Sequence, residues 1–280
     1  MKIYEALKWA SSFLQKHQAE ERVAEILLLH YLNYTKTDLL LHMRDELPPD
    51  IEKKWKANLQ QHIETGIPVQ HLTGKETFFN REFKVNEDVL IPRPETEEVV
   101  LHALKQFPAN GTTCVDVGTG SGVIGITIAL ERPELQVYAT DISEKALQIA
   151  KQNANTHHAS VHWMQGNFLQ PLIDQKIKVD AIISNPPYIS REEEPALSKT
   201  VRDFDPHLAL FADNDGLAAY EMIVEQAKEV LHPKGMIAFE IGYQQGEAVT
   251  QIIHRYFPSS KVQVFQDING NDRTVIALIE

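Results

Sequence analysis

The architecture of this chain can be inferred from ten consecutive residues, Thr113-Cys114-Val115-Asp116-Val117-Gly118-Thr119-Gly120-Ser121-Gly122. The first five are mostly apolar or β-branched and predict a buried strand, whereas the next five contain three glycines. An apolar run from Val123 to Leu130 follows and predicts a helix. Glycines at such a strand-to-helix turn let the backbone bend sharply and approach a ligand closely. The candidate ligand-binding residues of this turn are Gly118, Thr119, Gly120, Ser121 and Gly122.

Strands and helices alternate along the rest of the C-terminal half. The predicted strands are residues 113–117, 136–140, 161–165, 179–184 and 236–241, with helices starting near residues 123, 144 and 217. Alternation of this kind predicts a doubly wound α/β sheet with parallel strands. The last two predicted strands, 262–265 and 274–278, are joined by a segment too short for a crossover helix. We therefore expect a mostly parallel seven-stranded sheet with a C-terminal antiparallel hairpin.

The N-terminal part of the chain has a different pattern. Residues 1–66 carry apolar side chains at helical spacing, for example at Ile51, Trp55, Leu59 and Ile63, and predict a small helical domain. Residues 67–94 contain short extended pieces at 76–79, 82–85 and 89–91, with Asn80-Arg81 as a hairpin turn, and predict a β-hairpin linker. Residues 95–280 then form the α/β domain.

Composition excludes several classes of protein. The net charge is −12, with 39 acidic against 27 basic residues, which argues against a general nucleic-acid binder and leaves only a local basic groove open. Cys114 is the only cysteine, so neither an intrachain disulfide nor a cysteine-based zinc site can form, and the adjacent His157-His158 pair does not have ligand spacing. The N-terminus lacks a signal-peptide core, and the apolar runs are too short to span a bilayer. We expect a cytoplasmic monomer without a metal site.

Polar residues follow the predicted second and third strands. Asp141 ends the second strand 23 residues after Gly118, where a carboxylate binds the ribose hydroxyls of either NAD or S-adenosylmethionine. Gly120-Ser121-Gly122-Val123-Ile124-Gly125 also fits the dinucleotide pattern, so the glycines alone leave both cofactors open. Ser143 is expected to cap the next helix. At the end of the third strand, Asn167 is a candidate reader of an adenine amino group, and Phe168 could stack on the ring or pack in the core.

The fourth strand ends in Asn185-Pro186-Pro187-Tyr188. Each proline fixes its own φ and donates no N–H, so this loop is rigid and presents carbonyls and the Asn185 amide. The Asn185 oxygen and a proline carbonyl can accept hydrogen bonds from an –NH₂ group while the Tyr188 ring covers its flat face. The loop therefore suits a planar nitrogen acceptor. The order glycine turn, ribose carboxylate, base reader and acceptor loop favours methyl transfer.

Taken together, these residues resemble the class I S-adenosylmethionine-dependent methyltransferases, and five further stretches narrow the resemblance to the release-factor glutamine N5-methyltransferases, the PrmC/HemK family. The stretches similar to that family are residues 68–74, Phe78-Phe79, Leu90-Ile91-Pro92-Arg93-Pro94-Glu95-Thr96-Glu97, residues 206–211 and residues 215–217. Asn167 stands where that family usually has an acidic residue.

The resemblance implies an S-adenosylmethionine-dependent enzyme that methylates the side-chain amide of the glutamine in the Gly-Gly-Gln motif of peptide chain release factors. It also implies that Arg93 covers the cofactor pocket, although Arg93 between two prolines could equally form a rigid surface turn. We expect the helical domain to dock the protein substrate. An N-methyltransferase acting on amino groups of DNA or RNA bases is the alternative, and an NAD-dependent oxidoreductase is a third.

Overall fold

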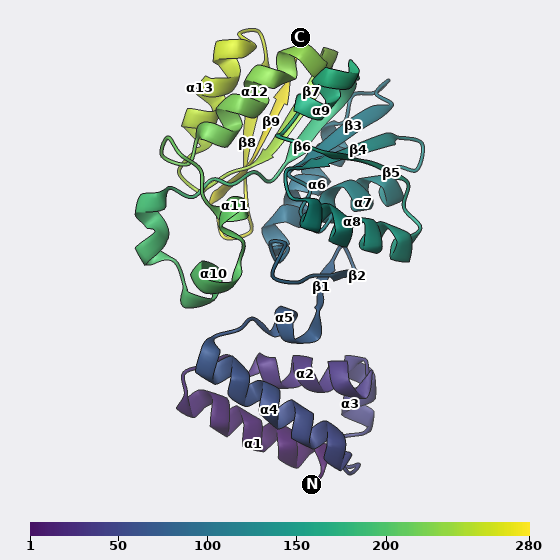
Figure 1. Cartoon of the computed structure of the whole chain (residues 1–280), viewed down its shortest axis with the longest axis vertical. Coiled ribbons are helices and arrows are strands. Elements are labelled where there is room, and N and C mark those ends of the chain that lie inside the picture. Colours follow the sequence, from purple (N-terminus) through teal and green to yellow (C-terminus); the bar gives the residue numbers. More distant parts are fainter. The chain divides into compact units, whose positions relative to one another are not determined.

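The computed structural model describes residues 1–280 (Figure 1). The chain divides into two compact units. One comprises Met1–Lys75 together with Ser198–Phe204, and the other comprises Glu76–Leu197 together with Asp205–Glu280. The segment expected as a linker, residues 67–94, is thus divided between the two units at Lys75.

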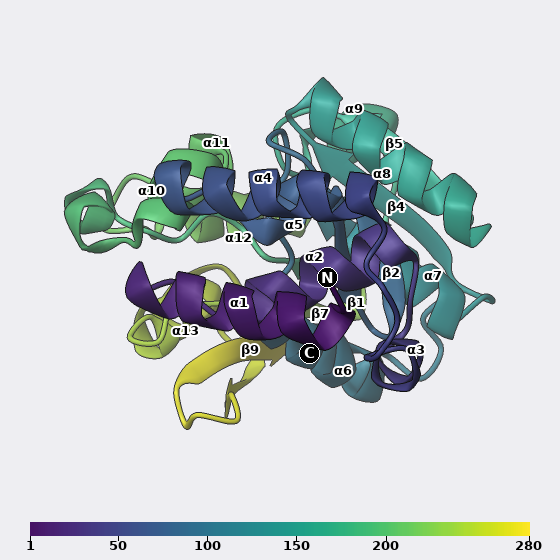
Figure 2. The same cartoon turned by 90° about the horizontal axis from the view of Figure 1, so that it is seen from below.

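The first unit is entirely helical. Its helices are α1 (Ile3–Lys16), α2 (Arg22–Leu32), α3 (Lys36–Leu41), α4 (Pro49–Thr65), α5 (Val69–Thr73) and α10 (Lys199–Phe204). The helices α1 and α4 run in nearly the same direction (Figure 2). The Trp9 and Trp55 rings pack with centroids 5.9 Å apart, and the fully buried Trp55 donates from Nε1 to the carbonyl of Ala24 over 3.0 Å. The helical N-terminal region expected from the sequence is therefore present.

The helix α10 belongs to this unit although it lies far along the chain from the other five helices. Thr200 Oγ1 donates to the carbonyl of Gly66 over 3.3 Å, and the Phe204 ring meets the His71 ring edge-on. The six-residue helix thereby packs against the end of α4 and against α5.

The second unit contains the seven-stranded sheet. In spatial order its strands are β5 (Val161–Gln165), β4 (Gln136–Asp141), β3 (Thr113–Val117), β6 (Val179–Ser184), β7 (Leu231–Glu240), β9 (Asp272–Leu278) and β8 (Lys261–Gln266). The first five are parallel, and β9 pairs antiparallel with both β7 and β8. The expected mostly parallel sheet with a C-terminal antiparallel hairpin is confirmed.

Helices cover both faces of the sheet (Figure 1). One face packs against α9 (Gln170–Gln175), α12 (Ala218–Val230) and α13 (Gly246–Tyr256), and the other against α6 (Pro94–Gln106), α7 (Val123–Glu131) and α8 (Glu144–His157). Alternate residues of β3 serve the two cores, with Val115 and Val117 on one face and Cys114 on the other. The chain proceeds from β3 toward β5 and then returns to β6 on the opposite side, so the strand order reverses between β3 and β6. Ligands of open α/β sheets bind at the carboxyl ends of strands at such a reversal.

A small hairpin precedes the sheet, formed by β1 (Lys75–Phe78) and β2 (Arg81–Lys84). Its turn is Phe79-Asn80, both with positive φ, and not Asn80-Arg81 as expected. The expected strand at residues 89–91 is wrong, because that segment has no strand partner and Val89 packs instead against Ala146 and Ile149 of α8. Two short helical segments, η1 (Arg191–Ala196) and α11 (His207–Leu210), follow the loop after β6.

Candidate functional site

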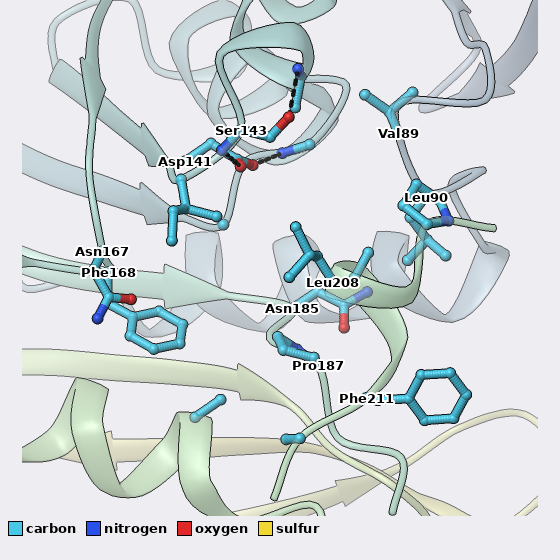
Figure 3. Close-up of a pocket in the computed structure, with 18 of the residues that line it drawn as sticks. Val89, Leu90, Asp141, Ser143, Asn167, Phe168, Asn185, Pro187, Leu208 and Phe211 are labelled. Carbon is cyan, nitrogen blue, oxygen red and sulfur yellow. Dashed lines mark hydrogen bonds between the residues drawn. The ribbon is translucent and has the colours of Figure 1, made fainter. Parts of the chain in front are cut away.

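The carboxyl ends of β3, β4, β5 and β6 border a cavity of about 350 Å³, within the size range of small-molecule sites (Figure 3). It brings together candidate residues from four separate strand ends. Those that line it are Gly118, Gly120, Asp141, Asn167, Phe168, Asn185 and Pro187. Those that do not line it are Arg93, Thr119, Ser121, Gly122, Pro186 and Tyr188.

The glycine turn leaves open space on the side of this cavity. Gly118 and Gly120 have φ of +70° and +55°, a conformation that side chains rarely adopt. A Cβ added to either residue would meet no atom within 4 Å. The backbone N–H groups of Gly118 and Thr119 both donate to the carbonyl of Thr140 over 2.9 Å, which holds the turn against β4. A ligand can therefore approach this backbone to contact distance.

Asp116 stabilises the glycine turn through hydrogen bonds. Its Oδ2 accepts hydrogen bonds from Thr119 Oγ1 over 2.5 Å and from the backbone N–H of Gly125 over 2.9 Å. Burial raises the pKa of the Asp116 carboxyl to about 7. Asp116 does not line the cavity. Its contacts with Thr119 and Gly125 join the glycine turn to the start of α7.

Asp141 connects the turn to the start of the next helix. Its two oxygens accept hydrogen bonds from the backbone N–H groups of Gly120 and Ser143, each over 2.8 Å (Figure 3). Burial raises the pKa of this carboxyl. Because each carboxylate oxygen has a second lone pair, Asp141 can still accept hydrogen bonds from ligand hydroxyls. Ser143 caps α8 as expected, since its Oγ accepts from the N–H of Ala146 over 3.2 Å.

Asn167 and Phe168 lie at one end of the cavity, across from Asn185 and Pro187 (Figure 3). Phe168 is partly buried against the core and also lines the cavity, so the two interpretations of its ring from the sequence are compatible. The Asn167 amide nitrogen lies 3.3 Å from the Met222 sulfur, a weak acceptor. A ligand amino or ring nitrogen would be a stronger partner for this amide.

The Asn-Pro-Pro-Tyr loop is tied down on both sides. The Asn185 amide nitrogen donates to Thr96 Oγ1 over 3.3 Å, and the carbonyl of Tyr188 accepts from Gln245 Nε2 over 2.9 Å. Asn185 and Pro187 border the first cavity, whereas Tyr188 borders a neighbouring one of about 360 Å³. The loop thus contributes residues to the lining of both cavities.

Arg93 binds Asp205, which directly precedes a segment that lines the first cavity. Its guanidinium donates to Asp205 Oδ2 over 2.9 Å, and the side chain of Asp205 is only 1% exposed. The following residues Pro206 and Leu208 line the cavity. Arg93 therefore acts on the cavity through Asp205, and it does not face the cavity itself.

Two buried residues of the site were missed by the sequence interpretation. Thr96 Oγ1 donates to Glu240 Oε2 over 2.6 Å, and the Tyr188 hydroxyl donates to Glu240 Oε1 over 3.4 Å. Burial raises the pKa of Glu240 to about 7. The available signal was an acidic residue at the carboxyl end of an apolar strand, the same signal that singled out Asp141.

Comparison with known proteins identifies the family. Residues 5–74 match the PrmC N-terminal domain, and residues 96–204 match the methyltransferase small domain. The chain is 47% identical to the release factor glutamine methyltransferase of Bacillus subtilis (strain 168), over 99% of this chain and 98% of that protein. It is 44% identical to that of Bacillus anthracis over the whole of both chains. The chain belongs to the release factor glutamine methyltransferase family.

Solved structures support the fold. A methyltransferase from Pyrococcus furiosus superposes with a TM-score of 0.53 at 16% identity, covering 80% of this chain and 98% of that one. The hMettl16 catalytic domain superposes with a TM-score of 0.57 at 14% identity, covering 82% of each chain.

Members of this family are methyltransferases, and the cofactor of this one is S-adenosylmethionine. The residues present fit that cofactor, because the glycine turn leaves room for a close approach and Asp141 has free acceptor positions beside it. The NAD interpretation of the glycines is therefore wrong. No helix is both long and apolar enough to cross a bilayer, and no group of three or more His, Cys, Asp or Glu side chains is arranged to hold a metal ion.

Proposed function

We propose that this protein transfers a methyl group from S-adenosylmethionine to N5 of the glutamine side chain in the Gly-Gly-Gln motif of peptide chain release factors. The observation that carries the proposal is the full-length similarity to release factor glutamine methyltransferases, at 44–47% identity. The position of Asn185 on the wall of the cofactor cavity agrees with it.

The chemistry requires alignment more than base catalysis. An amide nitrogen is a poor nucleophile because its lone pair is delocalised, so the enzyme must hold both N–H bonds and direct the nitrogen at the methyl group. Asn185 Oδ1 and the carbonyl of Pro186 are the proposed acceptors of those N–H bonds. The rigid prolines keep these acceptors fixed before the substrate binds. When bound, S-adenosylmethionine supplies the methyl group and leaves as S-adenosylhomocysteine, and water takes the proton released by the amide.

We assign cofactor binding to the cavity residues at the other strand ends. Gly118 and Gly120 admit the cofactor close to the backbone, Asp141 accepts hydrogen bonds from its ribose, and Asn167 and Phe168 contact its adenine. Thr119, Ser121 and Gly122 shape the turn, and Arg93 secures the far wall through Asp205.

The test uses labelled S-adenosylmethionine and three acceptors. These are an intact release factor, the same factor with its Gly-Gly-Gln glutamine changed to alanine, and adenine-containing DNA or RNA. Only the intact factor is expected to take label. Undiminished labelling of the alanine variant would reject the glutamine as the acceptor, and labelling of the nucleic acid would favour the alternative function.

The helical unit is proposed to dock the folded substrate, because a glutamine loop alone offers too little surface for specific recognition. Leu40 and Leu41 at the end of α3 are 72% and 74% exposed, unusual for neighbouring leucines. The double variant L40D/L41D is expected to raise KM for the intact factor and to leave KM for a short Gly-Gly-Gln peptide unchanged. I268D changes a residue that is 92% exposed in the β8–β9 turn and serves as the control. An unchanged KM for the intact factor would reject these leucines as the docking surface.

We also propose that the protein acts in the cytoplasm as a monomer and does not contact nucleic acid directly. The net charge of −12 supports a protein acceptor over a polyanionic one. Light scattering of the purified protein with and without its substrate measures the oligomeric state.

A further inference from the structure

Two buried side chains, those of Thr96 and Glu240, stand in series behind the partly buried Asn185 of the acceptor loop. The Asn185 amide nitrogen lies 3.3 Å from Thr96 Oγ1, and Thr96 Oγ1 lies 2.6 Å from Glu240 Oε2. Thr96 is 3% exposed and Glu240 is 2% exposed, so solvent does not compete for these contacts. The residues come from α6, the end of β6 and the end of β7, which meet only in the folded chain.

We propose that Thr96 and Glu240 are positioning residues whose hydrogen bonds fix which end of the Asn185 amide faces the cofactor cavity. This inference rests on the proposed function, because it assigns to Asn185 Oδ1 the task of accepting an N–H from the substrate amide.

The direction of the hydrogen bonds follows from counting hydrogens. A threonine hydroxyl has one hydrogen, and an ionised carboxylate can only accept, so Thr96 donates to Glu240. The Thr96 oxygen can then only accept from its other neighbour, which must present the –NH₂ end of the Asn185 amide. Asn185 Oδ1 is thereby turned away from Thr96 and left free for the substrate.

Protonation of Glu240 would reverse this order. A neutral carboxyl can donate to Thr96 Oγ1, whose hydrogen then points at Asn185 and favours Oδ1 on that side. The amide would rotate and offer its –NH₂ group to the substrate, where two donors would face each other. The Tyr188 hydroxyl, 3.4 Å from Glu240 Oε1, links the other end of the loop to the same carboxyl.

Charged and titratable groups from each neighbouring element surround Glu240. Arg273 on β9 favours its ionised form, whereas Glu95 on α6 favours its neutral form. Tyr188 donates to its side chain from the acceptor loop, and Tyr220 on α12 donates to its backbone carbonyl over 2.9 Å. Burial is the largest effect and raises the pKa of Glu240 to about 7. Methyl transfer is therefore expected to slow between pH 8 and pH 6 as Glu240 becomes neutral.

The test compares two substitutions of the same residue. T96V keeps the shape and removes the hydroxyl, whereas T96S keeps the hydroxyl. We expect T96V to lower kcat on the intact release factor about tenfold, the effect of one misdirected hydrogen bond, with unchanged KM and unchanged affinity for S-adenosylhomocysteine. T96S is expected to retain kcat within about twofold, because it preserves the hydrogen-bond order. A T96V enzyme with the wild-type kcat would overturn the proposal.

A second variant keeps the test decisive if T96V folds poorly. E240Q removes the titrating group, so its kcat is expected to be the same at pH 6 and pH 8. An E240Q enzyme that slows at low pH as the wild type does would assign the pH dependence to another group and reject the proposal. These outcomes are distinct from failure of the proposed function, in which the wild-type enzyme itself would not label the Gly-Gly-Gln glutamine.

Discussion

Replacing Gly120 by alanine should separate the stability of the glycine turn from its binding of the cofactor. Gly120 has φ of +55°, and its added Cβ would meet no protein atom within 4 Å. The left-handed backbone costs an L-residue about 1–2 kcal/mol, of which the reduced entropy of the unfolded chain offsets about 0.4–1 kcal/mol. A net loss of about 1 kcal/mol lowers Tm by about 2–4 °C for a unit of this size.

The cofactor should be affected more strongly than the fold. The new methyl group would occupy open space in the cavity that Gly120 and Asp141 both line, where we propose that the cofactor binds. Overpacking of this kind typically costs about 1–3 kcal/mol. The Kd for S-adenosylhomocysteine should therefore rise about 5- to 150-fold, which calorimetric titration measures directly.

Gly270 provides the matched control. It has φ of +79° in the β8–β9 turn, no atom lies within 4 Å of its added Cβ, and it is not part of the cavity. Gly270→Ala should lower Tm by a similar amount and leave the Kd unchanged. If Gly120→Ala bound S-adenosylhomocysteine with the wild-type Kd, the open space at the turn would not be where the cofactor lies.

Three further outcomes are expected. Asp141→Ala should raise the Kd for S-adenosylhomocysteine by a factor of about 10 to 150, the effect of losing charged hydrogen bonds worth about 1.5–3 kcal/mol. Asp180→Ala, which also removes a carboxylate bound to two backbone N–H groups but at the opposite end of β6, should leave that Kd unchanged in the same calorimetric assay. Asn185→Ala should lower kcat on the intact release factor far more than it weakens cofactor binding, and normal turnover would remove the loop from the mechanism. For Asp116→Asn, the Tm of the variant relative to that of the wild type should be higher at pH 8 than at pH 5.5. The folded pKa of about 7 lies above the ordinary value of 3.8, so the wild-type fold loses stability as the pH rises through this range and the carboxyl ionises. The same Tm difference at both pH values in thermal unfolding would contradict this.

Local sequence patterns were enough to predict the sheet and several of the residues that line the cavity. Gly118 and Asp141 could be recognised because Gly118 directly follows one apolar strand and Asp141 ends another, and all parallel strands end at the same edge of the sheet. Glu240 shows the same signal as Asp141, but the contact between Thr96 and Glu240 could not be recognised from it. They are 144 residues apart, and a hydrogen bond between such distant residues leaves no periodicity in the sequence.

Tertiary contacts also explain the errors in local structure. Phe79 takes the first position of the β1–β2 turn with φ of +49°, which local turn preferences disfavour for a bulky side chain. Its backbone N–H donates to Glu97 Oε1 on α6 over 2.8 Å, a contact that the turn sequence cannot reveal. Val89 has the apolar character of a strand residue but packs against α8, since no strand lies beside it.

The membership of α10 in the helical unit has a consequence for how the protein is made. A ribosome completes residues 1–75 first, but Ser198–Phe204 follows well over a hundred residues later. At about 5–20 residues per second, the nascent helical unit waits about 6–25 s for its last helix. During that interval the carbonyl of Gly66 and the ring of His71 lack the partners that α10 brings. The first part of the chain to be synthesised is thus finished only after most of the sheet has been translated, and a fragment ending at Lys75 would remain permanently in that unfinished state.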